Sequence, residues 1–474
     1  MKEAALPGSA SSPLADFASL ERYLDSLGLF RITPGLERIR DVLGRLELIR
    51  PPYLLVQVAG TNGKGSTTAM LAGLGQAHGL RVGLHTSPHF VHVRERIRIN
   101  GAPVEEDLWV RLANGLLCAG GESLSYFEFI TALAVLAFAA AKVDLAVMET
   151  GLGGRWDATT ALAADALLLT PIGLDHQAVL GAGLTAIARD KAGAIRPGVP
   201  VFSLPQEPEA WTEILRAARA KSSPLILVDP GEDARTPALP LRLEGPHQRA
   251  NAALALAGWR MLRPGGERPA RQSVSPFPAS PLERRGLASA WLPGRLQSVP
   301  PLTTAACLAL PAGHPARVFR PSPLGWPPLL LDGAHNSHAF AALEKSLSQA
   351  GIAPAAVIFA CLKDKNPRLI LPHLRALAAG PVFVPPLENN SRAIAAHILA
   401  GEIKAAPVSS LEDALRRAAA AVAASLPEAF GGGREKRPIL LCGSLYLLGD
   451  FFALRPDCLE PPPYSALLSL ENTE

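Results

Sequence analysis

Several kinds of residue are scarce in this sequence, and each scarcity narrows the class of protein. The 474 residues include five cysteines, and no two of them have the C-x-x-C spacing. They are Cys118, Cys307, Cys361, Cys442 and Cys458. We expect buried thiols in a reducing compartment, not a disulfide framework or a zinc site.

Long apolar runs and a strong charge imbalance are also missing. The longest uncharged apolar stretch, 129–141, is too short to span a bilayer. The N-terminal residues lack an apolar core of signal-peptide length. A net charge of +4 is small for this length, so it gives no case for a nucleic-acid partner. We expect a cytoplasmic, soluble protein without membrane or nucleic-acid partners.

Apolar residues are abundant, and their pattern predicts an α/β fold. The hydrophobic content of 48% is enough for large cores, and the length indicates two to three domains. Strand-like runs lie at 53–58, 81–85, 143–149, 165–170, 199–203 and 224–228. Helix-like runs lie at 66–78, 105–117, 127–141, 184–195 and 207–220. This alternation predicts a mostly parallel sheet that is covered by helices on both faces.

A second, smaller α/β region is predicted towards the C-terminus. Pro, Gly, Ser and Arg dominate 263–285, which predicts a solvated, flexible loop. Strands follow at 329–332, 356–360, 382–384 and 439–442. We therefore divide the chain into an N-terminal domain, 1–297, and a C-terminal domain, 298–474. The proline-containing tail from Glu460 is expected to be loosely held.

The stretch VAGTNGKGST, Val58–Thr67, is typical of a phosphate-binding loop, although it departs from the common pattern. In G-x-x-x-x-G-K-[ST] the hydroxyl follows the lysine directly, whereas Gly65 here separates Lys64 from Ser66. The glycines of this loop allow positive φ and a close approach to an anion. Lys64 can reach phosphate oxygens, and Ser66 can ligate Mg²⁺. The alternative is an ordinary strand–turn–helix with a surface lysine. The scarcity of lysine, ten against thirty-six arginines, weakens that alternative.

Other candidates follow predicted strands, where open α/β sheets bind ligands. Glu149 ends a strand directly before the glycine-rich loop Gly151–Arg155. A carboxylate in this position suits Mg²⁺; the alternative is a solvated glutamate at the end of a strand. The pair Asp175 and His176 is weak evidence by itself. Lys191 alone would be interpreted as a surface lysine. Further polar candidates in the second half of the chain follow strands, start a helix or lie near the domain junction: His247, Gln248, Asn251, Arg295, Asp332, His335, Asn336 and Ser444. For these the alternative is ordinary turn chemistry.

The order of these motifs resembles the folylpolyglutamate synthase / dihydrofolate synthase family of the Mur ligase superfamily. The resemblance runs from about Leu20 to about Phe452. It depends on GTNGKGS, TSPHFVHVRERIRING, FEFITALA, METGLGGRWDATT, GLDH, DKAGAIRPG, GPHQRANAALA, PGRL, LDGAHN and GSLYLLG. In this family the phosphate loop carries the additional glycine between lysine and hydroxyl.

The resemblance implies a P-loop-type ATPase domain followed by a smaller, Rossmann-like ligase domain. It implies that ATP phosphorylates a folate-type carboxylate and that the amine of L-glutamate attacks the acyl phosphate, releasing ADP and phosphate. Whether the acceptor is 7,8-dihydropteroate, tetrahydrofolate polyglutamates or both stays open. Two rivals remain: a Mur-like ligase for another acid or amino acid, and a non-enzymatic P-loop ATP-binding regulator.

The resemblance also implies roles for individual residues. The nucleotide would be bound by Gly60, Thr61, Asn62, Gly63, Lys64, Gly65, Ser66, Thr67, Asn251, Arg295, Asp332 and His335. Two Mg²⁺ ions would be held by Ser66, Glu149, His176 and Lys191, the last as a carbamate. Lys64, Glu149, His176 and Lys191 would be catalytic. Ser87, Phe127, Arg155 and Ser444 would contact the other substrates. Pro171 departs from the family's usual asparagine, and 295–332 is longer than usual.

Overall fold

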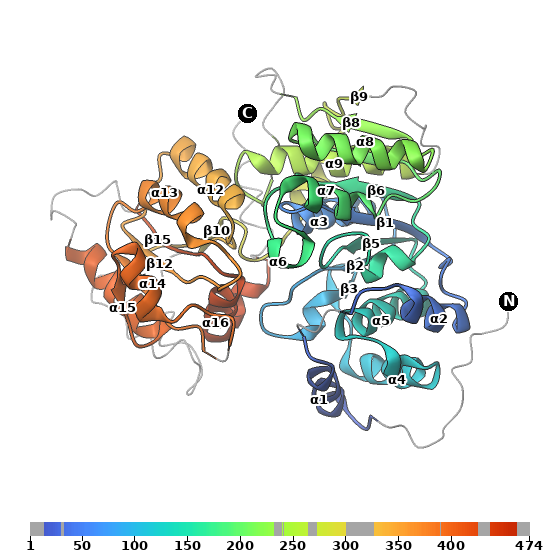
Figure 1. Ribbon diagram of the computed structural model, residues 1–474, viewed down its shortest axis with the longest axis horizontal. Helices are drawn as coiled ribbons and strands as arrows, with labels where there is room; N and C mark the ends of the chain where they lie inside the picture. Colours follow the sequence, from blue (N-terminus) through green and yellow to red (C-terminus); the bar gives the residue numbers. More distant parts are fainter. Residues whose placement is uncertain are drawn as a thin grey trace. The chain divides into compact units, whose positions relative to one another are not determined.

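The computed structural model describes residues 14–29, 33–231, 239, 241–263, 273–299, 327–388, 390–424 and 437–461. The chain forms two compact units (Figure 1). The first comprises the chain up to Gly173, Val179–Arg242 and Gln248–Ala290. The second comprises Leu174–Ala178, Leu243–His247 and the chain from Trp291. The predicted division at 297/298 falls within a strand of the second unit, Gln297–Val299.

The first unit contains a nine-stranded sheet in the order β4-β3-β2-β5-β1-β6-β7-β8-β9. The strands are β1 (Leu54–Ala59), β2 (Val82–His85), β3 (Ile97–Ile99), β4 (Ala102–Pro103), β5 (Leu145–Glu149), β6 (Ala166–Leu169), β7 (Val201–Ser203), β8 (Leu225–Val228) and β9 (Ser273–Val274). The pairs β2–β3 and β3–β4 are antiparallel, and the other pairs are parallel. β1 lies between β5 and β6, so the loop that follows it lies where the order of the strands reverses, the usual ligand position in such sheets.

Helices cover both faces of this sheet. One face is covered by α1 (Phe17–Leu27), α2 (Glu37–Arg45), α4 (Glu106–Cys118), α5 (Tyr126–Ala140), α7 (Leu184–Ala192) and α8 (Pro208–Ala220). The other face is covered by α3 (Lys64–Ala77), α9 (His247–Leu262) and α10 (Pro281–Ser289). The short α6 (Gln177–Leu180) buries no residue. Because both faces are covered, the central strands are mostly apolar, and five of the six residues of β1 are buried.

The prediction of a solvated loop over 263–285 is wrong at its C-terminal end. Residues from Pro281 form α10, which begins with a capping box between Ser280 and Glu283. Glu283 is buried and pairs with Arg260 at 2.8 Å. Gly286 lies against the backbone of α3, where a Cβ atom would collide with Leu74. The prediction used only the proline and glycine content of this segment. Proline is also common at a helix start and glycine at a close contact between helices, so that content does not distinguish α10 from a loop. Residues 264–272 lie outside the described residues.

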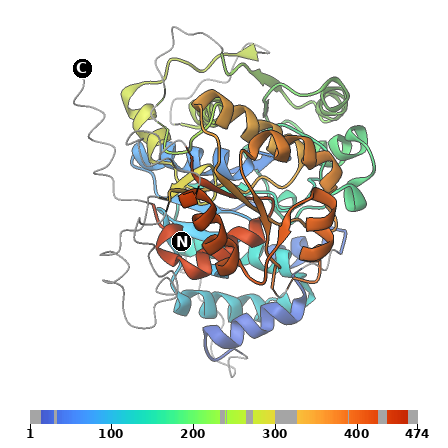
Figure 2. The ribbon, with the colours of Figure 1, turned by 90° about the vertical axis from the view of Figure 1, so that its left-hand side faces the viewer.

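The second unit contains a six-stranded sheet in the order β10-β11-β15-β12-β13-β14. Its strands and helices from β12 onwards are drawn in orange and red in Figure 2. The strands are β10 (Gln297–Val299), β11 (Leu329–Leu331), β12 (Ala356–Phe359), β13 (Val382–Val384), β14 (Ala406–Pro407) and β15 (Ile439–Cys442). β10 is antiparallel to β11, and the other pairs are parallel. One face packs against α12 (Ser337–Ala350), α13 (Pro367–Leu377) and α14 (Ala396–Ile403). The helix α15 (Leu411–Ala424) packs against β12, β13 and β15, and α16 (Leu445–Leu454) packs against β15.

The predicted fold class is therefore confirmed: a large, mostly parallel α/β sheet is followed by a smaller α/β unit. The four described cysteines are free thiols. Three are buried as predicted, but Cys118 is exposed at the end of α4, so that part of the prediction is wrong. No helix within the described ranges is long and apolar enough to cross a membrane. Cys307, most of the long stretch before β11 and the tail from 462 lie outside those ranges.

Candidate functional site

The glycine-rich loop joins β1 to α3 and depends on two glycines for its shape. Gly60 has φ 141° and Gly63, the residue before α3, has φ 91°. A Cβ atom on Gly60 would collide with the Thr170 side chain, and one on Gly63 would collide with Asn251. Residues that carry a side chain rarely adopt such backbone φ values. These two positions therefore require glycine for both conformation and space.

The start of α3 forms a cradle for an anion. Its first N–H groups have no partner within the helix, and the helix dipole places partial positive charge there. The Lys64 ammonium lies over the loop, with Nζ 3.1 Å from the Thr61 carbonyl oxygen. The amides of Thr61 and Asn62 instead donate to the Pro171 carbonyl, at 2.9 and 3.4 Å. The amides of Thr61 and Asn62, two of the residues predicted to bind the nucleotide, are thus hydrogen-bonded to the loop after β6.

A buried carboxylate lies beside this loop. Glu149, the last residue of β5, pairs in register with Val58 of β1, and it is 4% exposed. The Ser87 amide donates to Glu149 Oε2 at 3.0 Å. Ser66, in the first turn of α3, is 2% exposed. The hydroxyl of Ser66 and the carboxylate of Glu149 are hard oxygen donors, the kind of ligand that Mg²⁺ takes together with phosphate oxygens.

Lys191 is buried, and its side chain reaches the phosphate loop. It lies in the last turn of α7, is 4% exposed, and donates from Nζ to the Gly60 carbonyl oxygen at 2.7 Å. The interpretation of Lys191 as a surface lysine is therefore wrong. The glycine-rich loop after β5 packs on the same turn: the Arg155 amide donates to the Asp190 carbonyl at 2.9 Å, and a Cβ on Gly154 would collide with the Lys191 backbone.

Two of the predicted substrate contacts, Ser87 and Phe127, lie beside the end of β5. Phe127 is in the first turn of α5, whose start is capped by Ser125 and Glu128. A Cβ atom on Gly151 would collide with the Phe127 ring, so ring and loop are in contact. The Arg155 guanidinium lies 4.7 Å from the centre of the exposed Trp156 ring. An aromatic wall and a cation therefore border the loop that follows Glu149.

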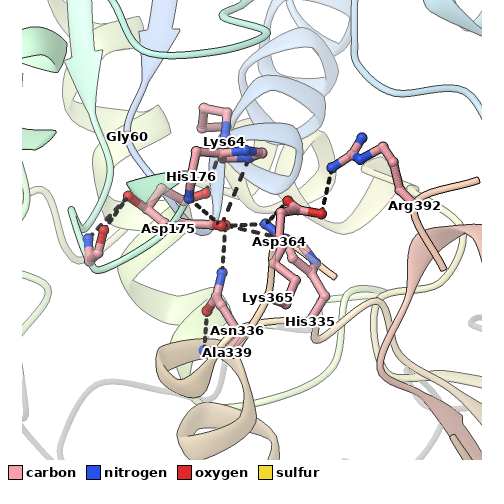
Figure 3. Close-up of polar contacts among 12 residues, drawn as sticks. Gly60, Lys64, Asp175, His176, His335, Asn336, Ala339, Asp364, Lys365 and Arg392 are labelled. Atoms are coloured by element: carbon pink, nitrogen blue, oxygen red, sulfur yellow. Dashed lines mark hydrogen bonds and ion pairs between the residues drawn. The ribbon is translucent and has the colours of Figure 1, made fainter. Parts of the chain in front are cut away.

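In the second unit, polar side chains gather around Asp175 (Figure 3). This carboxylate is 7% exposed and forms an ion pair with Lys365, itself 7% exposed. It accepts from the His176 amide at 2.7 Å and from Asn336 Nδ2 at 3.0 Å. His335 Nε2 lies 3.4 Å from Oδ2. Burial alone would raise the pKa of Asp175, but the hydrogen bond from His335 and the charges of its neighbours hold that pKa well below its usual value.

Lys365 was missed by the sequence reasoning, although a signal was present. It follows β12 in CLKDKN, which contains two of the ten lysines of the chain. Asp364 lies 3.9 Å from Lys365 and accepts from Arg392 Nη2 at 2.8 Å. Arg392 comes from the loop after β13. Its place beside Asp364 depends on the order of the strands, which no local pattern reveals.

The residues after β11 form a neighbouring group in the same unit. Asp332 accepts from the amides of Ala334 and Leu296, at 2.8 and 2.9 Å. Burial raises the pKa of Asp332, and the positive charge of Arg295 opposes that shift. His335 Nδ1 lies 2.7 Å from the Gly333 carbonyl oxygen. Arg295 and Asp332 thus influence each other electrostatically, and His335 bonds to the turn that follows Asp332.

Two further predicted site residues, Ser444 and Asn251, are buried at the ends of loops or helices that border the glycine-rich turns. Ser444 is 1% exposed and caps α16, since its hydroxyl accepts from the Tyr446 amide at 3.1 Å. The preceding Gly443 donates to the Ala334 carbonyl at 2.9 Å, which joins the loops after β15 and β11. Asn251 is buried on α9 against Gly63 of the phosphate loop.

The four predicted metal ligands are divided between the units. Ser66, Glu149 and Lys191 lie in the first, whereas His176 belongs to the short segment Leu174–Ala178 of the second. Among the described residues no group of three or more His, Cys, Asp and Glu side chains is placed to hold a metal ion. A divalent ion in the first unit would therefore draw ligands from hydroxyl or phosphate oxygens as well as from Glu149.

The fold and this strand-end loop define an α/β phosphate-binding protein with a second α/β unit. No protein-family model matches the chain. It is 32% identical over 382 residues to the dihydrofolate synthase/folylpolyglutamate synthase of Bacillus subtilis. The aligned region covers 74% of this chain and 80% of that protein. It resembles the structure of Escherichia coli FolC in complex with DHPP and ADP, with 28% identity and a TM-score of 0.75 over 95% of this chain and 99% of that one.

A second solved structure extends this likeness. A bifunctional folylpolyglutamate synthase/dihydrofolate synthase with Mn, AMPPNP and L-glutamate bound is 29% identical, with a TM-score of 0.72 over 93% of this chain and 98% of that one. The chain belongs to the folylpolyglutamate synthase/dihydrofolate synthase family. The family inferred from the order of the motifs is thus confirmed.

Proposed function

We propose that the protein is an ATP-dependent ligase that joins L-glutamate to a folate-type carboxylic acid and releases ADP and phosphate. The observation that carries this function is the phosphate loop at the end of β1, beside the buried Glu149 that pairs in register with Val58, with Phe127 and the Gly151 loop alongside. A nucleotide cradle thus adjoins an aromatic acceptor wall. Relatives with ADP, AMPPNP, DHPP or L-glutamate bound support the same substrates here.

The chain's contribution to phosphoryl transfer is positioning and charge. The amides at the start of α3 bind phosphate oxygens, and the Lys64 ammonium follows the charge that develops on the transferred γ-phosphoryl group. The acceptor carboxylate is held close to that group, which lowers the entropic barrier. The product of this step is an acyl phosphate on the acceptor. The amine of L-glutamate then attacks the acyl carbon and phosphate leaves, so no protein nucleophile is required.

Ser66 and Glu149 are proposed to hold one Mg²⁺, and Glu149, His176 and a carbamylated Lys191 are proposed to hold a second. A bound Mg²⁺ neutralises phosphate charge during transfer. The Ser87 amide orients the Glu149 carboxylate by donating to Oε2. The Gly60 carbonyl and the packed glycine loop orient the Lys191 side chain. Lysine is rarely buried unless it is paired, and the partner of Lys191 is a carbonyl of the phosphate loop, which supports a role within the site.

The remaining assignments are also proposals. Asn251, Arg295, Asp332 and His335 would contact the nucleotide, and Ser87, Phe127, Arg155 and Ser444 the other substrates. We propose 7,8-dihydropteroate, tetrahydrofolate polyglutamates or both as acceptors, a monomeric state, and small molecules as the only partners.

One assay tests the proposed function. ADP release is measured with ATP, L-glutamate and either 7,8-dihydropteroate or tetrahydrofolate, with each component omitted in turn. We expect ADP and phosphate, no AMP, and dependence on both glutamate and acceptor. With ¹⁸O in the acceptor carboxylate, the label should appear in phosphate. Turnover with another amino acid alone would indicate a different Mur-type ligase, and ATP binding without turnover would indicate a regulator.

A further inference from the structure

We infer that Arg38 is a positioning residue for the acceptor: through Glu128 it fixes the first turn of α5 and holds the Phe127 ring where the acceptor binds. This inference rests on the proposed function, in which Phe127 contacts the acceptor. Arg38 lies on α2 and Glu128 on α5. The helix α2 would thus take part in substrate binding without touching the substrate.

Phe127 lies between the two residues of the capping box that starts α5. Ser125 is the N-cap, and Glu128 is the third residue of the helix. The Glu128 carboxylate accepts from the Ser125 amide at 2.8 Å and from the Ser125 hydroxyl at 2.7 Å. A capping box of this kind satisfies amides that the start of a helix leaves open. The Glu128 side chain therefore fixes the backbone that carries the Phe127 ring.

The Phe127 ring also has close neighbours on two other elements. A Cβ atom on Gly151 would lie 2.6 Å from the Cζ atom of the ring, so the ring packs directly on the glycine-rich loop. The ring centre lies 5.8 Å from that of His85, the last residue of β2. Because these contacts are tight, a shift of the first turn of α5 would change the shape of the acceptor wall.

Arg38 binds Glu128 with two nitrogens of its guanidinium group. Nε donates to Oε2 at 3.2 Å, and Nη2 donates to Oε1 at 3.0 Å. Nη2 also donates to the Thr33 carbonyl at 2.6 Å, which ties the guanidinium to the segment before α2. The two helices pack against each other, and Figure 1 shows α2 beside α5. A two-point ion pair adds directional constraint as well as energy, so Arg38 orients the Glu128 carboxylate.

Glu128 depends on Arg38 because it is buried. Its side chain is 6% exposed, and Arg38 is the only cation that pairs with it in the described part of the chain. Removing one partner of a buried ion pair is costly, because the remaining charge is kept from water. Without Arg38, we expect Glu128 to turn towards water and to release Ser125. The first turn of α5 then loosens, and the Phe127 ring moves with it.

The same unit contains a second pair of this design, which provides a matched control. Glu283, the third residue of α10, accepts from the Ser280 amide at 2.8 Å. Arg260 of α9 binds Glu283 through the same two nitrogens, at 2.9 and 2.8 Å. The side chains of the two pairs are similarly exposed, 26% and 6% for Arg38 and Glu128 against 33% and 3% for Arg260 and Glu283. The control pair lies on the other face of the sheet from α5, and α10 contains no proposed substrate contact.

The test compares Arg38→Ala, Arg38→Lys, Glu128→Gln and the control Arg260→Ala in the full-length protein. KM and kcat are measured for the acceptor, ATP and L-glutamate, with 7,8-dihydropteroate and tetrahydrofolate as alternative acceptors. Urea unfolding of each variant reports its stability. Glu128→Gln keeps an oxygen that can accept from the Ser125 amide, so it removes the charge pair and retains the cap.

For Arg38→Ala we expect KM for the acceptor to rise about five- to tenfold, the size of one aromatic contact. We expect kcat, and KM for ATP and L-glutamate, to change less than about twofold, because only ground-state binding of the acceptor is lost. Arg38→Lys should recover part of the loss, since lysine keeps the charge without the planar fork. Glu128→Gln should raise KM for the acceptor by less than Arg38→Ala does. Arg260→Ala should lower the urea midpoint as much as Arg38→Ala and keep the KM values of wild type.

An unchanged KM for the acceptor in Arg38→Ala would overturn the inference. An equal rise in KM for all three substrates, or an equal rise for the acceptor in Arg260→Ala, would also overturn it, because either result would reflect a general loss of stability. If Arg38→Ala does not fold, the other two variants at the pair decide, and a wild-type KM for the acceptor in both overturns the inference. A wild-type enzyme without acceptor-dependent ADP release would instead overturn the proposed function and this inference with it. Because wild type is measured in the same assay, the two failures are distinguishable.

Discussion

The two strand-end clusters of this protein are built from different parts of the chain. In the first unit, the anion cradle consists of backbone amides at the start of α3 and glycines that bring other groups close. In the second unit, the cluster around Asp175 consists of side chains from Leu174–Ala178 and from the loops after β11 and β12. A backbone cradle is local in sequence, whereas a side-chain cluster is assembled by topology. The shape of the first cluster should therefore depend on its glycines, whereas the stability of the second should depend on its paired charges.

The largest expected effect concerns the side-chain charge of the first cluster. Lys64→Ala removes the ammonium from the loop, and we expect kcat to fall at least about a hundredfold, comparable with loss of one charge-stabilising donor. Stability should hardly change, since the backbone of the loop supplies its contacts. Lys221→Ala, at an exposed lysine of the same unit, is the control. If Lys64→Ala keeps more than about a tenth of wild-type kcat, a loss below about 1.4 kcal/mol, Lys64 does not have this role.

Lys191 should give the next largest effect, because we propose that its carbamate ligates metal. Activity should fall in CO₂-stripped buffer at low Mg²⁺ and recover with bicarbonate. Lys191→Ala should be nearly inactive. Lys191→Arg should not restore activity, because guanidinium stays cationic.

The measurement for Lys191 is ADP release at several bicarbonate concentrations, together with mass spectrometry of the intact protein for the added CO₂. An active Lys191→Arg enzyme would contradict the proposal and would leave Lys191 as a cation that donates to the Gly60 carbonyl.

Much of this architecture could be predicted from the sequence, and the part that could not has a physical reason. Buried parallel strands are continuous apolar runs, so β1, β5 and β6 were predicted within a few residues. The short edge strands β3 and β4, and α10 with its proline start, carry weak local signals and were missed. In the site, Gly60 and Lys64 lie within one motif. Lys365 and Arg392 meet Asp175 and Asp364 only through the sheet order, which single-sequence patterns do not contain.

Breaking the second cluster should lower stability in a way that depends on pH. Asp175→Asn removes the partner of the buried Lys365, and an unpaired buried charge costs about 3 kcal/mol. The pKa of Asp175 is held below its usual value. Its charged form therefore stabilises the fold at pH values above the unfolded pKa, near 3.9. That stabilisation is lost as the pH falls below this value towards the folded pKa.

Urea unfolding of wild type and Asp175→Asn checks this prediction. The difference in free energy of unfolding should be constant between about pH 5 and pH 8 and should shrink below about pH 4. The double variant Asp175→Asn with Lys365→Met should recover much of the loss, because it removes the unpaired cation as well. A difference that grows as the pH falls would show that the Asp175 carboxylate is not the stabilising group.

The smallest expected effect separates two costs of replacing a glycine in the first cluster. Gly63 and Gly79 have similar positive φ values, 91° and 83°. A Cβ atom on Gly63 would collide with Asn251, whereas one on Gly79 would meet nothing within 4 Å. Both alanine variants should therefore lose about 1 kcal/mol of stability through backbone strain. Gly63→Ala should lose a further 1–2 kcal/mol or so through overpacking, and its KM for ATP should rise because the loop must shift. Thermal unfolding and ATP kinetics of the two variants provide the measurement. Equal losses of stability, with an unchanged KM for ATP in both, would mean that the close approach of Gly63 to Asn251 does not shape the phosphate loop.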